Sequence, residues 1–116
     1  MKIVYYGSIF FKQRFGGISR YYYNLAKNLI EKDINFKIVS SLYKSSFLKN
    51  LDNNFKKGIY LKRYPDLKII EKIFQFSNDL YIDKIKPNIV HDTYYQEQFN
   101  NFKSLKVITV YDLIHE

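Results

Sequence analysis

Residues 2–29 read KIVYYGSIFFKQRFGGISRYYYNLAKNL, and this stretch decides the fold. It predicts a strand over Lys2–Tyr6, a loop over Gly7–Phe15, the glycine pair Gly16–Gly17 and a helix from Ile18 onward. A strand that enters a helix through glycines gathers unpaired backbone N–H groups at the positive end of the helix dipole, where a phosphate binds well. The spacing differs from the dinucleotide pattern G-x-G-x-x-G. A tight turn without a ligand explains the pair equally well.

Strands and helices alternate along the rest of the chain. The first helix carries an apolar stripe and ends near Lys32, and a second helix runs from Pro65 or Asp66 to Lys86, with Ser77–Asp79 as a bend. The further strands are expected over Phe36–Ser41, Ile59–Arg63, Asn88–His91 and Lys106–Tyr111. This alternation predicts an α/β, Rossmann-like parallel sheet with helices on both faces, formed as a single domain over residues 1–116.

The carboxyl edge of this sheet is the expected ligand site, because open parallel sheets bind ligands beyond the carboxyl ends of their strands. Four segments are expected to meet there: Gly7–Gly17, the chain after Ser41, Asp92–Tyr95 and Asp112–Glu116. The first of them carries aromatic side chains, Phe10 and Phe11 among them, that we expect to be exposed.

The composition excludes several classes of protein. The 116 residues include no cysteine, so disulfides and cysteine metal sites are ruled out. Two histidines without a paired carboxylate motif do not indicate a metal site. No stretch approaches the roughly 20 apolar residues of a membrane span, and no signal peptide is visible. We therefore expect a cytoplasmic protein, with the inner face of the membrane as a further location.

The net charge of +8 is concentrated in the segment Lys44–Lys72, which holds eight basic and three acidic residues. Such a segment attracts anionic lipid, nucleic acid or a phosphorylated ligand. A solvated lysine-rich surface is the alternative, and the sequence leaves both open.

Four motifs in order resemble the N-terminal domain of family-4-like glycosyltransferases. They are Met1–Tyr6, Phe15–Tyr21, Lys86–His91 and Val107–Glu116. The resemblance implies a GT-B fold, in which two Rossmann-like domains face a cleft, with this chain as an incomplete N-terminal half. It also implies a nucleotide-sugar donor as substrate, without a further cofactor.

The resemblance assigns roles to individual residues. Gly16 and Gly17 match the glycine pair beside the donor diphosphate, and Arg14 stands where related enzymes carry the lysine of K-x-G-G. His91 and Asp92 begin the loop that faces the acceptor, although packing is an alternative role for His91. Tyr111 replaces a histidine that points toward the transferred sugar. Asp112 follows it and either orients a ligand or caps a helix.

The resemblance implies an acceptor-side domain for making surface polysaccharide or glycolipid. The family's second domain supplies most donor contacts, and none of its motifs is present here, so we expect no sugar transfer by this chain alone. It is then a fragment of a longer enzyme or the product of a truncated reading frame. A lipid-linked acceptor would bring Lys44–Lys72 onto an anionic membrane. The alternatives are a basic module that binds nucleic acid or phosphate, which the core-like aromatic pattern disfavours, and an inert remnant that pairs with a separate C-terminal domain.

Overall fold

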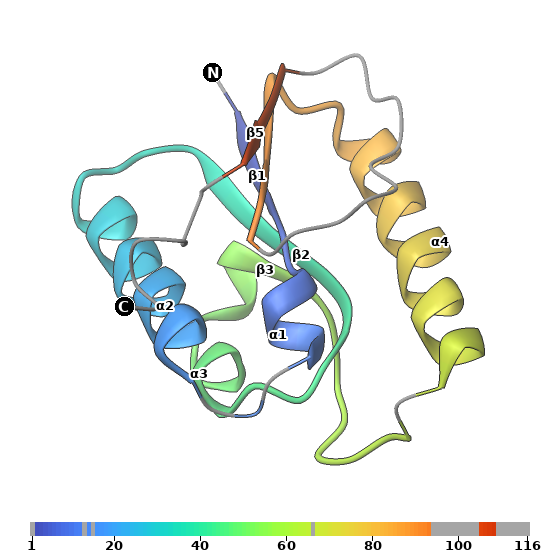
Figure 1. The fold of residues 1–116 in the computed structure, drawn as a ribbon. Helices are drawn as coiled ribbons and strands as arrows, with labels where there is room; N and C mark the ends of the chain where they lie inside the picture. The colour runs from blue at the N-terminus through green and yellow to red at the C-terminus, as the bar shows by residue number, and fades with distance from the viewer. Residues whose placement is uncertain (1, 13, 15, 66, 94–104, 109–116) are drawn as a thin grey trace.

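A five-stranded parallel sheet forms the middle of the protein (Figure 1). The computed structural model describes residues 2–12, 14, 16–65, 67–93 and 105–108. The strand order is β3-β2-β1-β4-β5. The strands are β1 (Ile3–Tyr6), β2 (Phe36–Tyr43), β3 (Lys56–Tyr60), β4 (Ile89–Asp92) and β5 (Leu105–Ile108). The α/β, Rossmann-like arrangement expected from the sequence is thus confirmed.

Helices cover both faces of the sheet (Figure 1). On one face, α2 (Gly17–Glu31) and α3 (Ser46–Lys49) enclose an apolar cluster that includes Tyr5, Tyr22 and Ile38. On the other face, α4 (Lys68–Ile85) encloses a cluster that includes Val4, Phe74 and Val90. Because β1 is central, its alternate side chains enter both clusters. A short 3-10 turn, η1 (Asn53–Phe55), precedes β3.

The expected loop over Gly7–Phe15 is partly wrong, because Ser8–Lys12 forms a short helix, α1. The expectation that Phe10 and Phe11 are exposed is also wrong, since both are buried. Phe10 joins the cluster beneath α2, whereas Phe11 stacks on Phe74 of α4 with ring centroids 4.2 Å apart. A five-residue helix is too short to show a period in the sequence, and tertiary burial stabilises it instead.

The third strand begins three residues earlier than Ile59, the residue expected from the sequence. It starts with Lys56, which is buried and donates from Nζ to the carbonyl oxygens of Leu48 at 2.8 Å and Lys49 at 2.9 Å. Gly58 has a φ of 147°, and a Cβ there would lie 1.6 Å from the Ser40 carbonyl oxygen. Pairing with β2 therefore overrides the low strand propensity of lysine and glycine.

The sequence predicted a bend at Ser77–Asp79, but α4 continues through these residues, and Asn78 joins the helix to the sheet. The pairing of β2 with β3 shifts register between Val39 and Leu42, which leaves backbone groups of β2 outside the ladder. The buried Asn78 amide accepts from the Ser41 N–H at 2.6 Å and donates to the Val39 carbonyl at 2.9 Å. One side chain thus satisfies both a donor and an acceptor of the irregular strand.

Substituting Asn78→Leu should lower the free energy of unfolding by about 2–4 kcal/mol, because it leaves a buried N–H and a buried carbonyl without their partner. Urea unfolding followed by circular dichroism measures the change. Asn24→Leu on the exposed side of α2 is the matched control and should change stability by less than about 0.5 kcal/mol. Equal effects of the two substitutions would contradict this role of Asn78.

Candidate functional site

The strand order reverses between β1 and β4, and this switch point is where ligands bind in sheets of this type. Gly7 leaves β1 at this point in very close contact with β2. Its N–H donates to the Val39 carbonyl at 2.8 Å, and a Cβ at Gly7 would lie 2.5 Å from the Cβ of Ser40. Only glycine therefore fits here, and the close turn directs α1 across the carboxyl edge.

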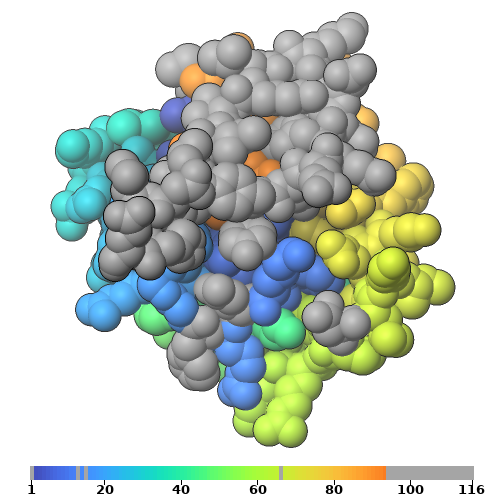
Figure 2. Space-filling view, viewed as in Figure 1, coloured from blue at the N-terminus to red at the C-terminus, as the bar shows by residue number. Residues whose placement is uncertain are grey.

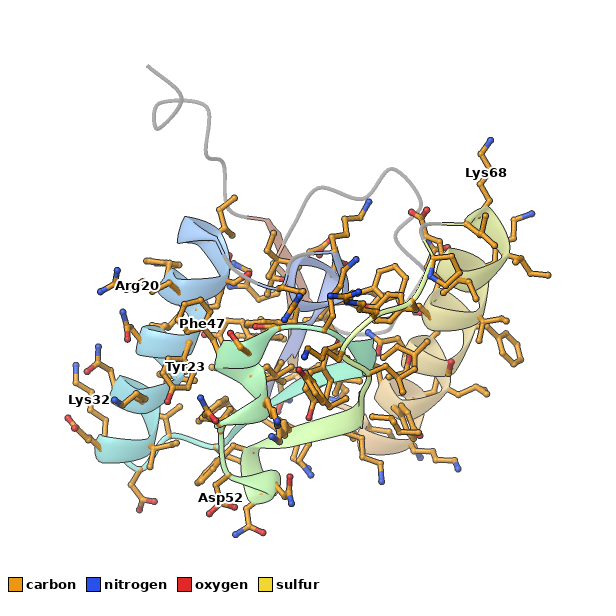
Figure 3. The ribbon with its side chains drawn as sticks, turned by 90° about the horizontal axis from the view of Figure 1, so that it is seen from below. Arg20, Tyr23, Lys32, Phe47, Asp52 and Lys68 are labelled. Atoms are coloured by element: carbon orange, nitrogen blue, oxygen red, sulfur yellow. The ribbon has the colours of Figure 1, made fainter. Side chains whose placement is uncertain are left out.

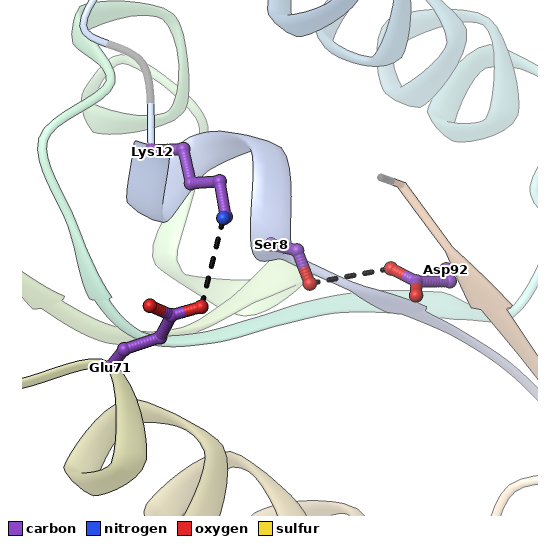
Figure 4. A network of polar contacts seen from close by, with 4 residues as sticks. All are labelled: Ser8, Lys12, Glu71 and Asp92. Carbon is purple, nitrogen blue, oxygen red and sulfur yellow. Dashed lines mark hydrogen bonds and ion pairs between the residues drawn. The ribbon is translucent and has the colours of Figure 1, made fainter. Parts of the chain in front are cut away.

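A buried polar cluster fixes the start of α1 at the switch point. The Ser8 hydroxyl donates to Asp92 Oδ1 at 3.3 Å (Figure 4). The Thr93 hydroxyl donates to the Tyr6 carbonyl at 2.6 Å and accepts from the Ile9 N–H at 3.2 Å. Asp92 is 1% exposed. Its carboxylate is thus held inside the protein against α1, and this contact is a structural role that the sequence did not indicate.

The far end of α1 contacts α4. Lys12 Nζ lies 3.7 Å from Glu71 Oε1 in an ion pair between partly exposed side chains (Figure 4). The Tyr64 hydroxyl donates to the carbonyl of Phe11, and their rings stack with centroids 5.1 Å apart. These contacts hold the C-terminal end of α1 against α4 and the segment before it. Helix α1 therefore covers the carboxyl edge of the sheet between the helices of the two faces.

His91 points to the opposite face of the sheet from Asp92. Its ring lies 5.2 Å from that of Tyr5 between centroids, and its Nε2 is 3.5 Å from the Tyr22 hydroxyl. Burial lowers the pKa of His91 below the usual 6.5. This half-buried, aromatic environment favours the neutral imidazole, which both donates and accepts a hydrogen bond.

The residues expected to bind the donor phosphate lie at and before the start of α2, with Arg14 and Gly16 between α1 and α2 and Gly17 as the first residue of α2. The Arg14 carbonyl accepts from the backbone N–H of Ser46 at 3.2 Å and from its hydroxyl at 3.3 Å, which joins this segment to α3. Gly16 precedes α2 with a φ of 154°, a conformation that favours glycine. Gly17 is exposed, and a Cβ there would meet no described atom within 4 Å. The backbone alone therefore requires Gly16 but not Gly17.

The remaining expected site residues, Tyr111 and Asp112, lie outside the described residues. Among the residues that are described, no group of three or more His, Asp or Glu side chains is arranged to hold a metal ion. Within the same part of the chain, no helix is long and apolar enough to cross a bilayer.

The lysines of the segment Lys44–Lys72 do not share one surface. Lys56 is buried against α3. The next residue of β3, Lys57, points to α4 instead, and its Nζ lies 5.2 Å from the centre of the Tyr81 ring. Lys44 and Lys49 lie over the rings of Tyr64 and Tyr60, respectively, at 4.8 Å. Several of these cations thus make local contacts, and a count of charge along the sequence overstates the basic surface.

Two further features were missed by the sequence analysis. The Tyr6 hydroxyl donates to Asp79 Oδ1 at 3.1 Å, and burial beside this carboxylate raises the pKa of Tyr6. At the opposite, amino edge of the sheet, a hollow is lined by residues that include Lys2, Asn35 and Lys37. Polar residues within two positions of the end of a buried strand, Ser8 after β1 and Thr93 after β4, are the sequence pattern that could have indicated the cluster at the carboxyl edge.

The chain matches no known family model, and comparisons with curated proteins and with solved structures also give no match. The glycosyltransferase resemblance thus depends on the four sequence motifs alone.

Lowering the pH should destabilise the protein through His91. Because its pKa is lowered in the folded state, the unfolded chain binds a proton first, and the free energy of unfolding falls as the pH decreases below 6.5. In a His91→Gln variant this part of the pH dependence should disappear. Urea unfolding from about pH 7.5 to 5.5 tests this, and parallel curves for variant and wild type would contradict it.

Proposed function

We propose that this chain is the acceptor-side, N-terminal domain of a nucleotide-sugar-dependent glycosyltransferase that makes surface polysaccharide or glycolipid. The observation that carries the proposal is the switch point between β1 and β4. Two of the four motifs, Met1–Tyr6 and Lys86–His91, end at this point. A parallel sheet of this order suits a nucleotide-binding enzyme. The family's second domain supplies most of the donor contacts, so the proposal assigns no complete transfer reaction to these residues alone.

The glycine pair at the start of α2 is the proposed contact for the donor diphosphate. The N-terminus of this 15-residue helix carries N–H groups and a partial positive charge. The fold does not need glycine at residue 17, since a side chain there would meet no described atom. A ligand that approaches the backbone closely explains the second glycine, and Arg14 would add a positive charge beside it.

The proposed contacts with the acceptor and the transferred sugar are still made by four residues: His91, Asp92, Tyr111 and Asp112. In the folded chain Asp92 accepts from Ser8 and His91 packs between tyrosines, so a sugar would bind either side chain by replacing one of these contacts. The proposal places the reaction in the cytoplasm, which the lack of cysteine allows.

Binding of nucleic acid is a weaker alternative, because bases stack on exposed aromatic rings. Among the described residues the exposed rings are Tyr21 on α2 and Phe76 on α4. These helices cover opposite faces of the sheet, so the two rings do not form one stacking surface (Figure 1).

Gly17→Ala separates the ligand proposal from a role in folding. The new methyl group has free space and alanine is the better helix residue, so the free energy of unfolding should rise by roughly 0.5 kcal/mol. Binding of UDP or GDP, measured by titration calorimetry, should weaken by on the order of tenfold, because the methyl group blocks the approach of the diphosphate.

Asn24→Ala, which lies on the exposed side of the same helix, is the control and should leave nucleotide binding unchanged. An alanine at position 17 that stabilises the chain without weakening nucleotide binding would overturn the assignment of Gly17. A wild-type chain that binds neither nucleotide at millimolar concentration would argue against the proposed donor site as a whole.

A further inference from the structure

Helix α4 has a second apolar face that points away from the sheet. Four large side chains, Ile69, Ile73, Phe76 and Leu80, follow the spacing i, i+4, i+7, i+11. They are 64%, 52%, 68% and 47% exposed, respectively. The inner face of the same helix is separate and buries Phe74, Asn78 and Ile82. The apolar residues of α4 are therefore divided between two faces of the helix.

Helix α4 forms one flank of the molecule (Figures 1 and 2), and the exposed fractions show that this stripe faces outward. Leu67, the residue directly before the helix, is also 53% exposed. From Ile69 to Leu80 the stripe is about 16 Å long at the rise of an α-helix. A continuous apolar stripe of this size on a helix surface indicates a contact with something other than water.

The charges around the stripe are mainly positive. Exposed cations lie before the helix, in its first turns and at its end: Lys62, Arg63, Lys68, Lys72, Lys84 and Lys86. Figure 3 shows Lys68 at the N-terminal end of α4, with its side chain extending outward. Of the acids on α4, Glu71 pairs with Lys12, and Asp79 accepts from Tyr6. Asp83 is the exposed acid on the helix, so cations prevail along this face.

We infer that the outer face of α4 binds an anionic lipid surface, with the helix parallel to the membrane. Apolar side chains would enter the boundary between headgroups and acyl chains, while the flanking lysines contact the anionic headgroups. Lysines near such a surface each contribute to binding through its negative potential. Self-association through the same stripe is disfavoured, because each copy carries a net charge of +8 and the cations would meet one another.

This surface takes only part of the basic segment Lys44–Lys72, namely Lys62, Arg63, Lys68 and Lys72, and adds the apolar face of α4, which the count of charge does not include. The inference also does not depend on sugar transfer, because it uses neither the switch point nor the glycine pair. Nucleotide binding and lipid binding can therefore succeed or fail separately.

Co-sedimentation of the full chain with vesicles tests the inference. The vesicles contain phosphatidylcholine alone or phosphatidylcholine mixed with phosphatidylglycerol. The wild-type chain should bind the mixed vesicles at low salt, and binding should weaken with added salt. The variant Ile73→Gln/Phe76→Gln, which changes exposed positions, should partition into the vesicles on the order of tenfold less.

Tyr21→Gln is the matched control, since Tyr21 is 53% exposed on α2 at the other face of the sheet. It should bind vesicles as the wild type does. Lys68→Gln/Lys72→Gln should weaken binding and reduce its dependence on salt. The inference is overturned if the wild type does not bind anionic vesicles, or if the α4 double variant binds them as well as the control. Dimers in sedimentation velocity without lipid, lost in the α4 variant, would identify a second copy as the occupant and also overturn it.

Discussion

The rest of the structure depends on the close contact between Gly7 and β2. There is no space for a side chain at this position, because a Cβ there would lie only 2.5 Å from the Cβ of Ser40. The turn directs Ser8–Lys12 across the carboxyl edge of the sheet, where Ile9 and Phe10 enter one apolar cluster and Phe11 the other. One short helix therefore connects both cores. Its first residues are fixed by Asp92 of β4 and by Thr93, which follows β4, so hydrogen bonds join α1 to the switch point of the sheet.

Much of the fold could be predicted from the sequence, because long elements repeat their apolar pattern. The parallel sheet, the helix over Gly17–Glu31 and the second long helix follow from periodicity and turn residues. The errors concern short elements. Nothing local predicts a helix at Ser8–Lys12, and the strand at Lys56–Tyr60 depends on its pairing with β2 and on contacts of a buried lysine with α3. Tertiary contacts decide such segments.

The site was less predictable than the fold. The sequence indicated which strand ends would meet, but not that Asp92 would be buried against Ser8 or that His91 would pack between Tyr5 and Tyr22. These contacts depend on which face of β4 each residue occupies, and α1 was needed to provide the partner. Gly17 presents the opposite case. It is a glycine that the described structure does not require, and a ligand would explain it.

The most direct test of the account is to locate where a nucleotide binds. Backbone amide shifts of the ¹⁵N-labelled chain during titration with UDP or GDP report the contact surface residue by residue. The account predicts changes at the carboxyl edge, at Ser8, Gly16, Gly17 and Thr93. Changes confined to the hollow at the amino edge, around Lys2, Asn35 and Lys37, would contradict it, as would a spectrum that does not change at all.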